Sequence, residues 1–273
     1  MLGRNFNTAW VFILVFCFGA CKKSSKNIDE PTVQSQKLYP DSIFYIQSSN
    51  VVVKPVQALS GSYVSLPEGL KIDKRTGYID VNQSETGLRY LVLFTPDGST
   101  ETQKSYLTIS GINYADKIFN LALGDSIARP IYNADAKLSF PNAGKNNVFD
   151  EGGSCKKAGI VLNGENGVIN LAQSIRNQAI DTGATEQVKL VYRLNDGSNR
   201  TVNGINIKIY FYRNAGEIPK YLTELLATRR TTVLAAGTDA QSTATSTQNL
   251  LSLASKSVSL ARPRPPCIIV VGN

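Results

Sequence analysis

The chain has 273 residues, a formal net charge of +8 and no histidine. The lack of histidine excludes serine–histidine and cysteine–histidine catalysis as well as imidazole zinc sites. The excess positive charge lies at the two ends, because residues 27–226 carry 20 basic and 20 acidic side chains, and this balance argues against a nucleic-acid-binding face on the folded part.

The first 20 residues have the order that a secretory signal peptide requires. Arg4 precedes an unbroken run of ten apolar residues over 9–18, and the small residues Gly19 and Ala20 follow it. Ten residues are too few to cross a bilayer as a helix, which takes about 20, but they match the apolar region of a signal peptide. We therefore expect residues 1–20 to be removed during export.

Cys21 directly follows this signal. Residues 18–21 (FGAC) resemble the lipobox of bacterial lipoproteins, and the resemblance implies that Cys21 carries the lipid. Residues 22–26 (KKSSK) resemble the start of exported lipoproteins of the Bacteroidota type. Because this run is basic, it favours an outer-membrane lipoprotein that faces the periplasm over one exposed at the surface, with residues 21–37 as anchor and linker. An ordinary signal peptide with a coincidental cysteine is the alternative.

An internal repeat organises the middle of the chain. The pattern of residues 69–84 returns in residues 159–174 at an offset of 90. Further on, the DGS of residues 97–99 returns in residues 196–198 at an offset of 99. We therefore expect nine extra residues in the second copy, in a loop around residues 175–184.

Each copy consists of short segments in which apolar and polar residues alternate, as in half-buried strands. Glycine-containing turns separate them, and the Asp-Gly pairs are hairpin signals. Many short strands at close spacing predict a β-sandwich.

The first copy also carries a recognisable motif, LPEGLKID over residues 66–73 and TGYI over residues 76–79. It resembles the Ig-like domains of bacterial surface proteins, whose motif runs LPxGLxxDxxTGxI. The resemblance implies an all-β chain with two tandem Ig-like β-sandwiches, over residues 38–114 and 115–214. Such domains serve as spacers, stalks or binding modules, so the resemblance implies a fold rather than a chemistry.

The remaining residues 215–273 are predicted to form a short helix and a low-complexity, partly disordered tail. The helix covers residues 217–227, with an apolar stripe, and residues 231–249 are a linker rich in Thr, Ala and Ser. A second helix is expected at 250–261, and residues 267–271 (CIIVV) are strand-like. An exposed apolar strand promotes aggregation unless it pairs with another strand. Residues 267–271 could therefore dock on a partner or donate a strand to it.

Two cysteines remain in the mature domains, Cys155 and Cys267. In an oxidising compartment they could form a disulfide. Two separate small apolar side chains are the alternative, since no CxxC spacing indicates redox or metal chemistry.

One short segment resembles a catalytic motif. Residues 180–184 (IDTGA) resemble the nucleophilic-water motif of aspartic proteases, which would make Asp181 one of two paired carboxylates. A plain β-turn is favoured, because the Thr-Gly pair recurs in the first copy as Thr86-Gly87 after a glutamate. The acidic turns near Asp73 and Asn163 lack the residue spacing of a calcium-binding loop, so we interpret them as solvent-exposed turns. No metal or cofactor is expected.

Together these features predict a membrane-anchored envelope lipoprotein that acts as a non-enzymatic binding or spacer module. Its partners would be the membrane, through the lipid, and another envelope protein or a polysaccharide, but no nucleic acid. A carboxylate-based envelope hydrolase, either aspartic-protease-like at Asp181 or a glycosidase, is one alternative. An assembly subunit that donates its C-terminal strand is the other.

Overall fold

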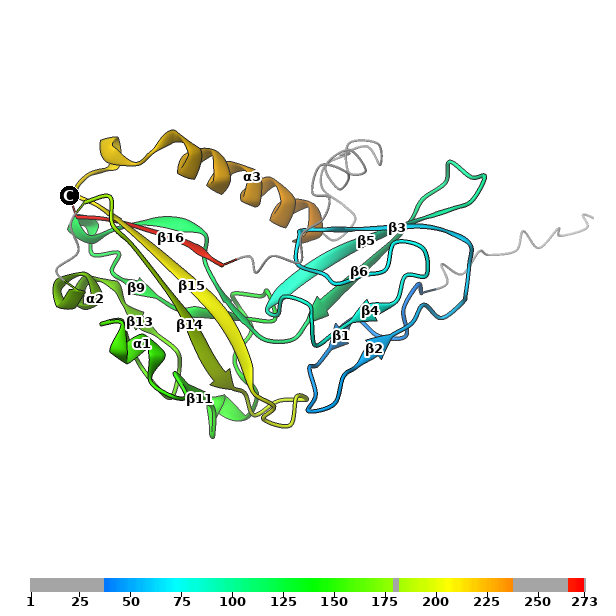
Figure 1. Ribbon diagram of the computed structural model, residues 1–273, viewed down its shortest axis with the longest axis horizontal. Helices are drawn as coiled ribbons and strands as arrows, with labels where there is room; N and C mark the ends of the chain where they lie inside the picture. Colours follow the sequence, from blue (N-terminus) through cyan, green and yellow to red (C-terminus); the bar gives the residue numbers. More distant parts are fainter. Residues whose placement is uncertain (1–36, 179–181, 238–264, 273) are drawn as a thin grey trace, which may run out of the picture. The chain divides into compact units, whose positions relative to one another are not determined.

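The computed structural model describes residues 37–178, 182–237 and 265–272 (Figure 1). The proposed lipidation site Cys21, Asp181, the linker beyond residue 237 and the expected helix at 250–261 lie outside these residues. The described chain is mostly β, with several sheets and three α-helices. The all-β prediction was therefore right in the main but missed two of the helices.

The first sandwich consists of a four-stranded sheet and a two-stranded sheet that pack across one core. The larger sheet has the order β1 (Ile43–Phe44), β6 (Gln103–Ile109), β5 (Leu88–Pro96) and β3 (Gly61–Leu66), and the smaller pairs β2 (Val52–Val53) with β4 (Ile79–Asp80). Their core contains buried side chains from both sheets, among them Val53, Ile79, Tyr63, Tyr90 and Phe94. The alternation of the strands explains this core, since every second residue of β5 (Leu88, Tyr90, Val92, Phe94) faces it.

The second sandwich has a five-stranded sheet with the order β11, β14, β15, β16 and β8, and a three-stranded sheet with the order β12, β13 and β9. The strands of the larger sheet are β11 (Val148–Phe149), β14 (Thr185–Arg193), β15 (Asn203–Tyr212), β16 (Cys267–Val271) and β8 (Lys117–Asn120). The smaller sheet contains β12 (Val161–Leu162), β13 (Ile169–Asn170) and β9 (Ile127–Ala128). A further pair, β7 (Ile112–Tyr114) and β10 (Pro130–Tyr132), follows the first sandwich.

Strand β16 lies in the interior of the second sheet, parallel to both β15 and β8 (Figure 1). All five of its residues are buried. Ile268 and Val270 face the core shared with the smaller sheet, while Ile269 and Val271 face the helix-covered side. A continuous apolar run is the sequence pattern of a strand buried on both faces. The segment that the sequence assigned to a low-complexity tail is therefore an inner strand of the second sandwich.

The first turns of helix α3 (Lys220–Gly237) cover the outer face of this sheet, and the helix also contacts strands β3 and β5 of the first sandwich. Leu222 is fully buried and, with Ile218, Leu225 and Leu226, packs on the side chains of β15 and β16. The helix begins three residues later than predicted, directly after Pro219, and it continues through residues 231–237, which the sequence assigned to a linker.

The extra residues of the second copy form a helix rather than a loop at their start. Helix α2 (Leu171–Gln178) follows β13 directly, and the Asn170 carboxamide oxygen accepts a hydrogen bond from the Gln173 amide at 2.9 Å in its first turn. Leu171 and Ile175 are buried in the second core, which explains why a helix forms here. The short helix α1 (Ser154–Lys157) was not predicted either.

The internal repeat is confirmed at the level of single hydrogen bonds. The Ser84 hydroxyl accepts from the Lys71 amide at 3.0 Å and donates to the Asp80 carbonyl at 2.6 Å. Ser174, ninety positions later, accepts from the Val161 amide at 2.9 Å and donates to the carbonyl of Asn170 at 2.6 Å. Both copies therefore fold into the same turn.

A tyrosine secures the glycine of this turn in each copy. Tyr39 donates to the Gly77 carbonyl at 2.8 Å, and Tyr114 donates to the Gly167 carbonyl at 2.6 Å. Both glycines have positive φ, 69° and 70°, a conformation that favours glycine. The two sandwiches are thus built on one local plan.

Truncation of Ile268 tests the place of β16 in the core. Ile268→Ala should lower the free energy of unfolding by about 2–5 kcal/mol, because it opens a cavity in the core between the two sheets of the second sandwich. The measurement is equilibrium urea unfolding followed by circular dichroism. Leu123→Ala, at an 81% exposed position, is the matched control and should change stability by less than about 0.5 kcal/mol. Equal stability of the two variants would contradict the inner position of β16.

Candidate functional site

The two sandwiches meet where the β14–β15 turn of the second lies on the first. The Asp196 carboxylate accepts hydrogen bonds from the Ser110 hydroxyl at 3.1 Å and the Tyr132 hydroxyl at 2.9 Å. Its other oxygen accepts from the amide and hydroxyl of Ser198, at 2.9 and 2.6 Å. Removing a carboxylate from water without hydrogen-bond partners costs free energy. The four donors to Asp196 offset this cost and hold the carboxylate in position.

Gly197 allows this turn to approach the first sandwich closely. A Cβ at this position would lie 2.8 Å from the Tyr45 ring, so only glycine fits without displacing the ring. The Gly197 carbonyl accepts from the Gln47 side-chain amide at 2.8 Å. The Asp-Gly-Ser signal in the sequence therefore serves two purposes, a tight turn and a contact between the sandwiches.

A buried hydroxyl pair reinforces the same junction. The hydroxyls of Thr86 and Tyr192 lie 3.0 Å apart, and the Tyr192 oxygen accepts from the Ile112 amide at 3.2 Å. The Asn203 carboxamide donates to the Thr86 hydroxyl at 3.2 Å. Burial raises the pKa of Tyr192 above its ordinary value, so its hydroxyl stays neutral and available for these bonds.

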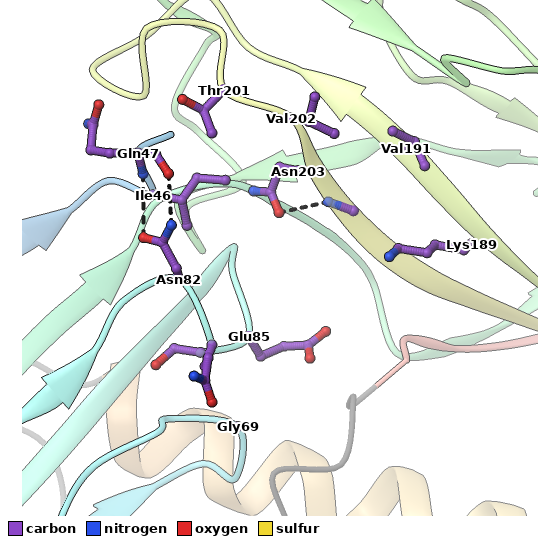
Figure 2. Close-up of a pocket in the computed structure, with 13 residues that line it drawn as sticks. Ile46, Gln47, Gly69, Asn82, Glu85, Lys189, Val191, Thr201, Val202 and Asn203 are labelled. Atoms are coloured by element: carbon purple, nitrogen blue, oxygen red, sulfur yellow. Dashed lines mark hydrogen bonds between the residues drawn. The ribbon is translucent and has the colours of Figure 1, made fainter. Parts of the chain in front are cut away.

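A pocket of about 390 Å³ opens beside this junction (Figure 2). The first sandwich contributes Ile46, Gln47, Gly69, Asn82, Gln83, Ser84 and Glu85 to its lining, and the second contributes Lys189, Val191, Thr201, Val202, Asn203 and Gly204. The volume falls in the range of small-molecule sites, roughly 300–1,000 Å³. Neither sandwich forms the pocket alone.

Hydrogen bonds position several of the polar side chains that line this pocket. The Asn82 carboxamide donates to the carbonyls of Gln47, at 2.7 Å, and Ser49, at 3.3 Å. The Asn203 oxygen accepts from the Gly204 amide at 2.7 Å. Figure 2 shows Glu85 on the wall formed by the first sandwich and Lys189 on the wall formed by the second.

The lining defines what the pocket can do chemically. Its amides, hydroxyls and one ammonium group can donate and accept hydrogen bonds. Glycoside hydrolysis requires two carboxyl groups about 5–10 Å apart, whereas Glu85 is the single acid among the described residues that line the pocket. The described lining of this pocket therefore lacks the second carboxyl group that glycoside hydrolysis requires.

The resemblance to aspartic proteases receives no support from the residues next to Asp181, which itself lies outside the described chain. The Thr182 hydroxyl donates to the Glu217 carboxylate, and this bond lowers the pKa of Glu217. Gly183 has a φ of 86°, as in a turn. Thr182 therefore connects the turn to the segment before α3.

The two cysteines are thiols and do not form the disulfide that the sequence allowed. Cys155 lies in α1 and is buried in the core between the sheets of the second sandwich. Cys267 lies in β16 and faces α3 on the opposite side of the large sheet. The sheet separates them, so the alternative of two separate small apolar side chains holds.

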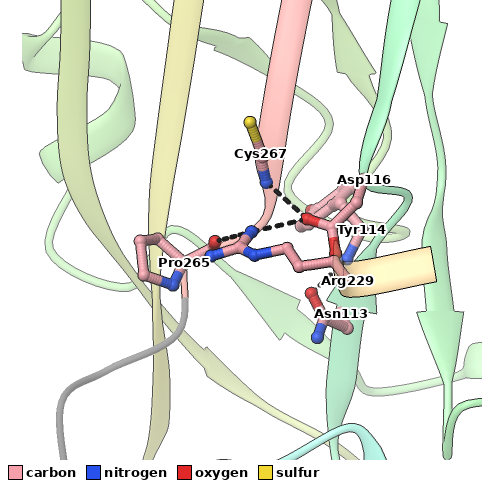
Figure 3. A network of polar contacts seen from close by, with 6 residues as sticks. All are labelled: Asn113, Tyr114, Asp116, Arg229, Pro265 and Cys267. Carbon is pink, nitrogen blue, oxygen red and sulfur yellow. Dashed lines mark hydrogen bonds and ion pairs between the residues drawn. The ribbon is translucent and has the colours of Figure 1, made fainter. Parts of the chain in front are cut away.

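A second polar cluster connects α3, β16 and the segment between the sandwiches (Figure 3). One Asp116 oxygen accepts from the Arg229 guanidinium at 2.8 Å and from the Cys267 amide at 2.6 Å. The guanidinium also donates to the Pro265 carbonyl at 2.8 Å. With side chains only 13% and 16% exposed, this ion pair is protected from solvent screening. This cluster could not be predicted from the sequence, because its members come from three distant segments.

No family model matches the chain, and no curated protein matches it. The structure is distantly similar to fragments of Drosophila N-cadherin and human protocadherin-24, at 11% and 9% identity. The TM-scores are 0.19 and 0.21, and each match covers 63% of this chain. The chain spans 47% of the N-cadherin fragment and 95% of the protocadherin fragment.

A SusE-like, surface-located polysaccharide-binding protein from the heparin utilisation locus of Bacteroides thetaiotaomicron is also similar. The match has 10% identity and a TM-score of 0.23, and it covers 64% of this chain and 34% of that protein. Superpositions with TM-scores this low support no inference about the function of this chain. None of the helices in the described ranges is long and apolar enough to cross a membrane.

The thiols offer a direct test of this arrangement. Burial, with a contribution from Asp150, raises the pKa of Cys155 to about 12, and only the thiolate is nucleophilic. In the folded, detergent-purified protein at pH 8, iodoacetamide should therefore modify Cys155 and Cys267 far more slowly than in 8 M urea, as followed by peptide mass spectrometry. Rapid modification without denaturant, or a Cys155–Cys267 peptide under non-reducing conditions, would contradict it.

Proposed function

We propose that the chain is a lipid-anchored, non-enzymatic binding module of the cell envelope, and that its junction pocket binds a hydroxyl-rich ligand such as a short stretch of polysaccharide. The composite lining of the pocket carries this proposal. Side chains from both sandwiches converge on it, and hydrogen bonds at the junction hold its walls in place. A pocket that is preformed loses little conformational entropy on binding.

The lining suits a carbohydrate in two respects. Each sugar hydroxyl both donates and accepts, and side-chain amides such as Asn82 and Asn203 present both a donor and an acceptor. The apolar side chains of Val191 and Val202 provide a surface for the C–H faces of a sugar ring, and Val202 is 48% exposed.

The N-terminal sequence supports the anchoring part of the proposal. The signal peptide and the lipobox-like residues 18–21 would leave Cys21 as the lipidated first residue of the mature chain. Lys22, Lys23 and Lys26 would then lie next to the membrane, where basic residues interact favourably with anionic lipids. The basic run favours the periplasm-facing side of the outer membrane, and the LPxGLxxDxxTGxI resemblance supports an exported Ig-like module.

An assembly role through donation of the C-terminal strand is less well supported. Strand β16 forms both of its ladders within its own chain, and all its side chains are buried. Donation to a neighbour would leave β15 and β8 without their shared partner.

Removal of the proposed lipid site tests the anchor. Cys21→Ala should move the protein from the membrane fraction to the soluble envelope fraction, because the variant lacks the acyl chains that bind the membrane. These chains contribute about 0.8 kcal/mol of binding free energy for each buried methylene. The measurement is an immunoblot of both fractions after high-salt washing, with Cys155→Ala as the control that should stay in the membrane fraction. Membrane association of Cys21→Ala equal to that of the wild type would refute lipid anchoring at this residue.

Replacement of Lys189 tests the pocket. Lys189→Ala should weaken binding of a neutral envelope polysaccharide by about 10-fold or more, because hydrogen bonds to charged groups contribute about 1.5–3 kcal/mol. Affinity electrophoresis through gels that contain the polysaccharide measures the effect. Lys156→Ala removes an exposed lysine far from the lining and should bind like the wild type. If no such polysaccharide retards the wild type, or if both variants migrate alike, the pocket does not serve this role.

A further inference from the structure

Gly204 of β15 leaves the space through which Lys189 of β14 enters the junction pocket. A Cβ at position 204 would lie 2.8 Å from Cε of Lys189, so the lysine side chain runs directly across the glycine. In the register of the two strands, Gly204 lies opposite Val191, whereas Lys189 lies opposite Asn206. The lysine therefore leans along the outer face of the sheet, towards the pocket that Gly204 and Val191 line.

We propose that the junction pocket selects a saccharide that carries a carboxylate or sulfate group, that the Lys189 ammonium binds this group, and that Gly204 positions the ammonium. This inference rests on the proposed function of the pocket and adds a charge to its ligand. A saccharide that binds through its hydroxyls alone would satisfy the proposed function but not this inference.

The Lys189 ammonium is available to a ligand. Figure 2 shows it directed into the pocket, towards the wall formed by the first sandwich. Lys189 forms no ion pair and no side-chain hydrogen bond with the residues that the structure describes. An ammonium group offers three donors together with its charge. Its hydrogen bonds to a carboxylate or sulfate would be stronger than those between neutral groups.

The surroundings of Lys189 carry no negative charge on its own side of the pocket. Its neighbours on the outer face of β14 and β15 are uncharged or positive: Gln187, Val191, Gly204, Asn206 and Lys208. The alternation of the strands places them there, since Leu190 and Ile207 face the core. Glu85, the single acid among the described residues of the lining, belongs to the first sandwich. An acidic group is therefore favoured beside Lys189 and away from Glu85.

The charge of the lining indicates the kind of anion. Lys189 is the single cation among the described residues that line the pocket. One ammonium balances the one negative charge of a uronate or a sulfate ester, whereas a phosphate monoester carries about −1.5 to −2 at pH 7. The Gln83 amide and the Thr201 hydroxyl also line the pocket, and neither side chain forms a hydrogen bond with a described residue. These groups fit the hydroxyls of a sugar ring with one acidic substituent.

Saccharides that differ only in charge test the proposal. The probes are trigalacturonate with its neutral trimethyl ester, and sulfated lactose with lactose, each studied by isothermal titration calorimetry with the full-length protein in detergent. An acidic member should bind about tenfold or more tightly than its neutral counterpart, because hydrogen bonds to charged groups contribute more than those to neutral ones. This preference should fall as the NaCl concentration rises, because salt screens exposed charges.

Three variants locate the charge recognition. Lys189→Gln keeps a hydrogen-bond donor but not the charge, so it should bind both members of a pair with equal affinity. Gly204→Ala should reduce the preference several-fold, because the added Cβ displaces the Lys189 side chain although the lysine is still present. Lys208→Ala removes a cation from the same face of the sheet but outside the lining, so it should keep the preference.

A double variant separates positioning from a general structural effect. If Gly204 acts through Lys189, Gly204→Ala combined with Lys189→Gln should bind like Lys189→Gln alone, whereas independent effects would add. Gly204→Ala should fold normally, because Gly204 has no positive φ and the next nearest atom to the added Cβ, the Leu190 carbonyl oxygen, is 3.5 Å away. Urea unfolding of each variant checks this.

The possible failures are distinguishable. Equal affinity of the wild type for both members of each pair would overturn this inference and leave the proposed function intact. A preference that persists in Lys189→Gln, or that disappears in Lys208→Ala, would show that the charge is recognised elsewhere. Additive effects in the double variant would overturn the role of Gly204. If the wild type binds neither acidic nor neutral saccharides, the proposed function fails and this inference fails with it.

Discussion

The contact of the 196–198 turn with the first sandwich is the feature on which the junction pocket depends. Asp196 joins the two sandwiches because its carboxylate accepts from Ser110, at the end of the first, and from Tyr132 in the second. Gly197 permits the approach to Tyr45. Because these short-range contacts fix the junction, the side chains of the junction pocket can converge from two separate sheets.

The sequence predicts the part of this architecture that local interactions determine. The 69–84 and 159–174 segments match because each must place a glycine at positive φ and a serine between two backbone groups, and these needs are met within 16 residues. The Asp-Gly-Ser hairpin signals were equally local. The candidate pocket could not be derived in this way, because its lining comes from two copies whose relative placement depends on Tyr45, Ser110 and Tyr132.

Helices α1 and α2, the length of α3 and the place of β16 were missed for a related reason. An eight-residue helix such as α2 is marginal alone, and burial of Leu171 and Ile175 in the second core stabilises it. The CIIVV run of β16 did carry a signal, since five consecutive apolar residues indicate a strand buried on both faces. This apolar run indicates that the strand is buried, but it does not indicate which strands lie beside it. That β15 and β8 are its neighbours could therefore not be inferred from the sequence.

The inner position of β16 has a consequence for the order in which the protein can fold. Strand β8 begins at Lys117 and β15 ends at Tyr212, but the strand that joins them begins at Cys267. The second sheet therefore cannot close until residues 267–271 are available, long after its other strands have been synthesised. If residues 1–20 direct export of an unfolded chain, as the sequence predicts, the second sandwich would stay open during transport and would be completed only on the far side of the membrane.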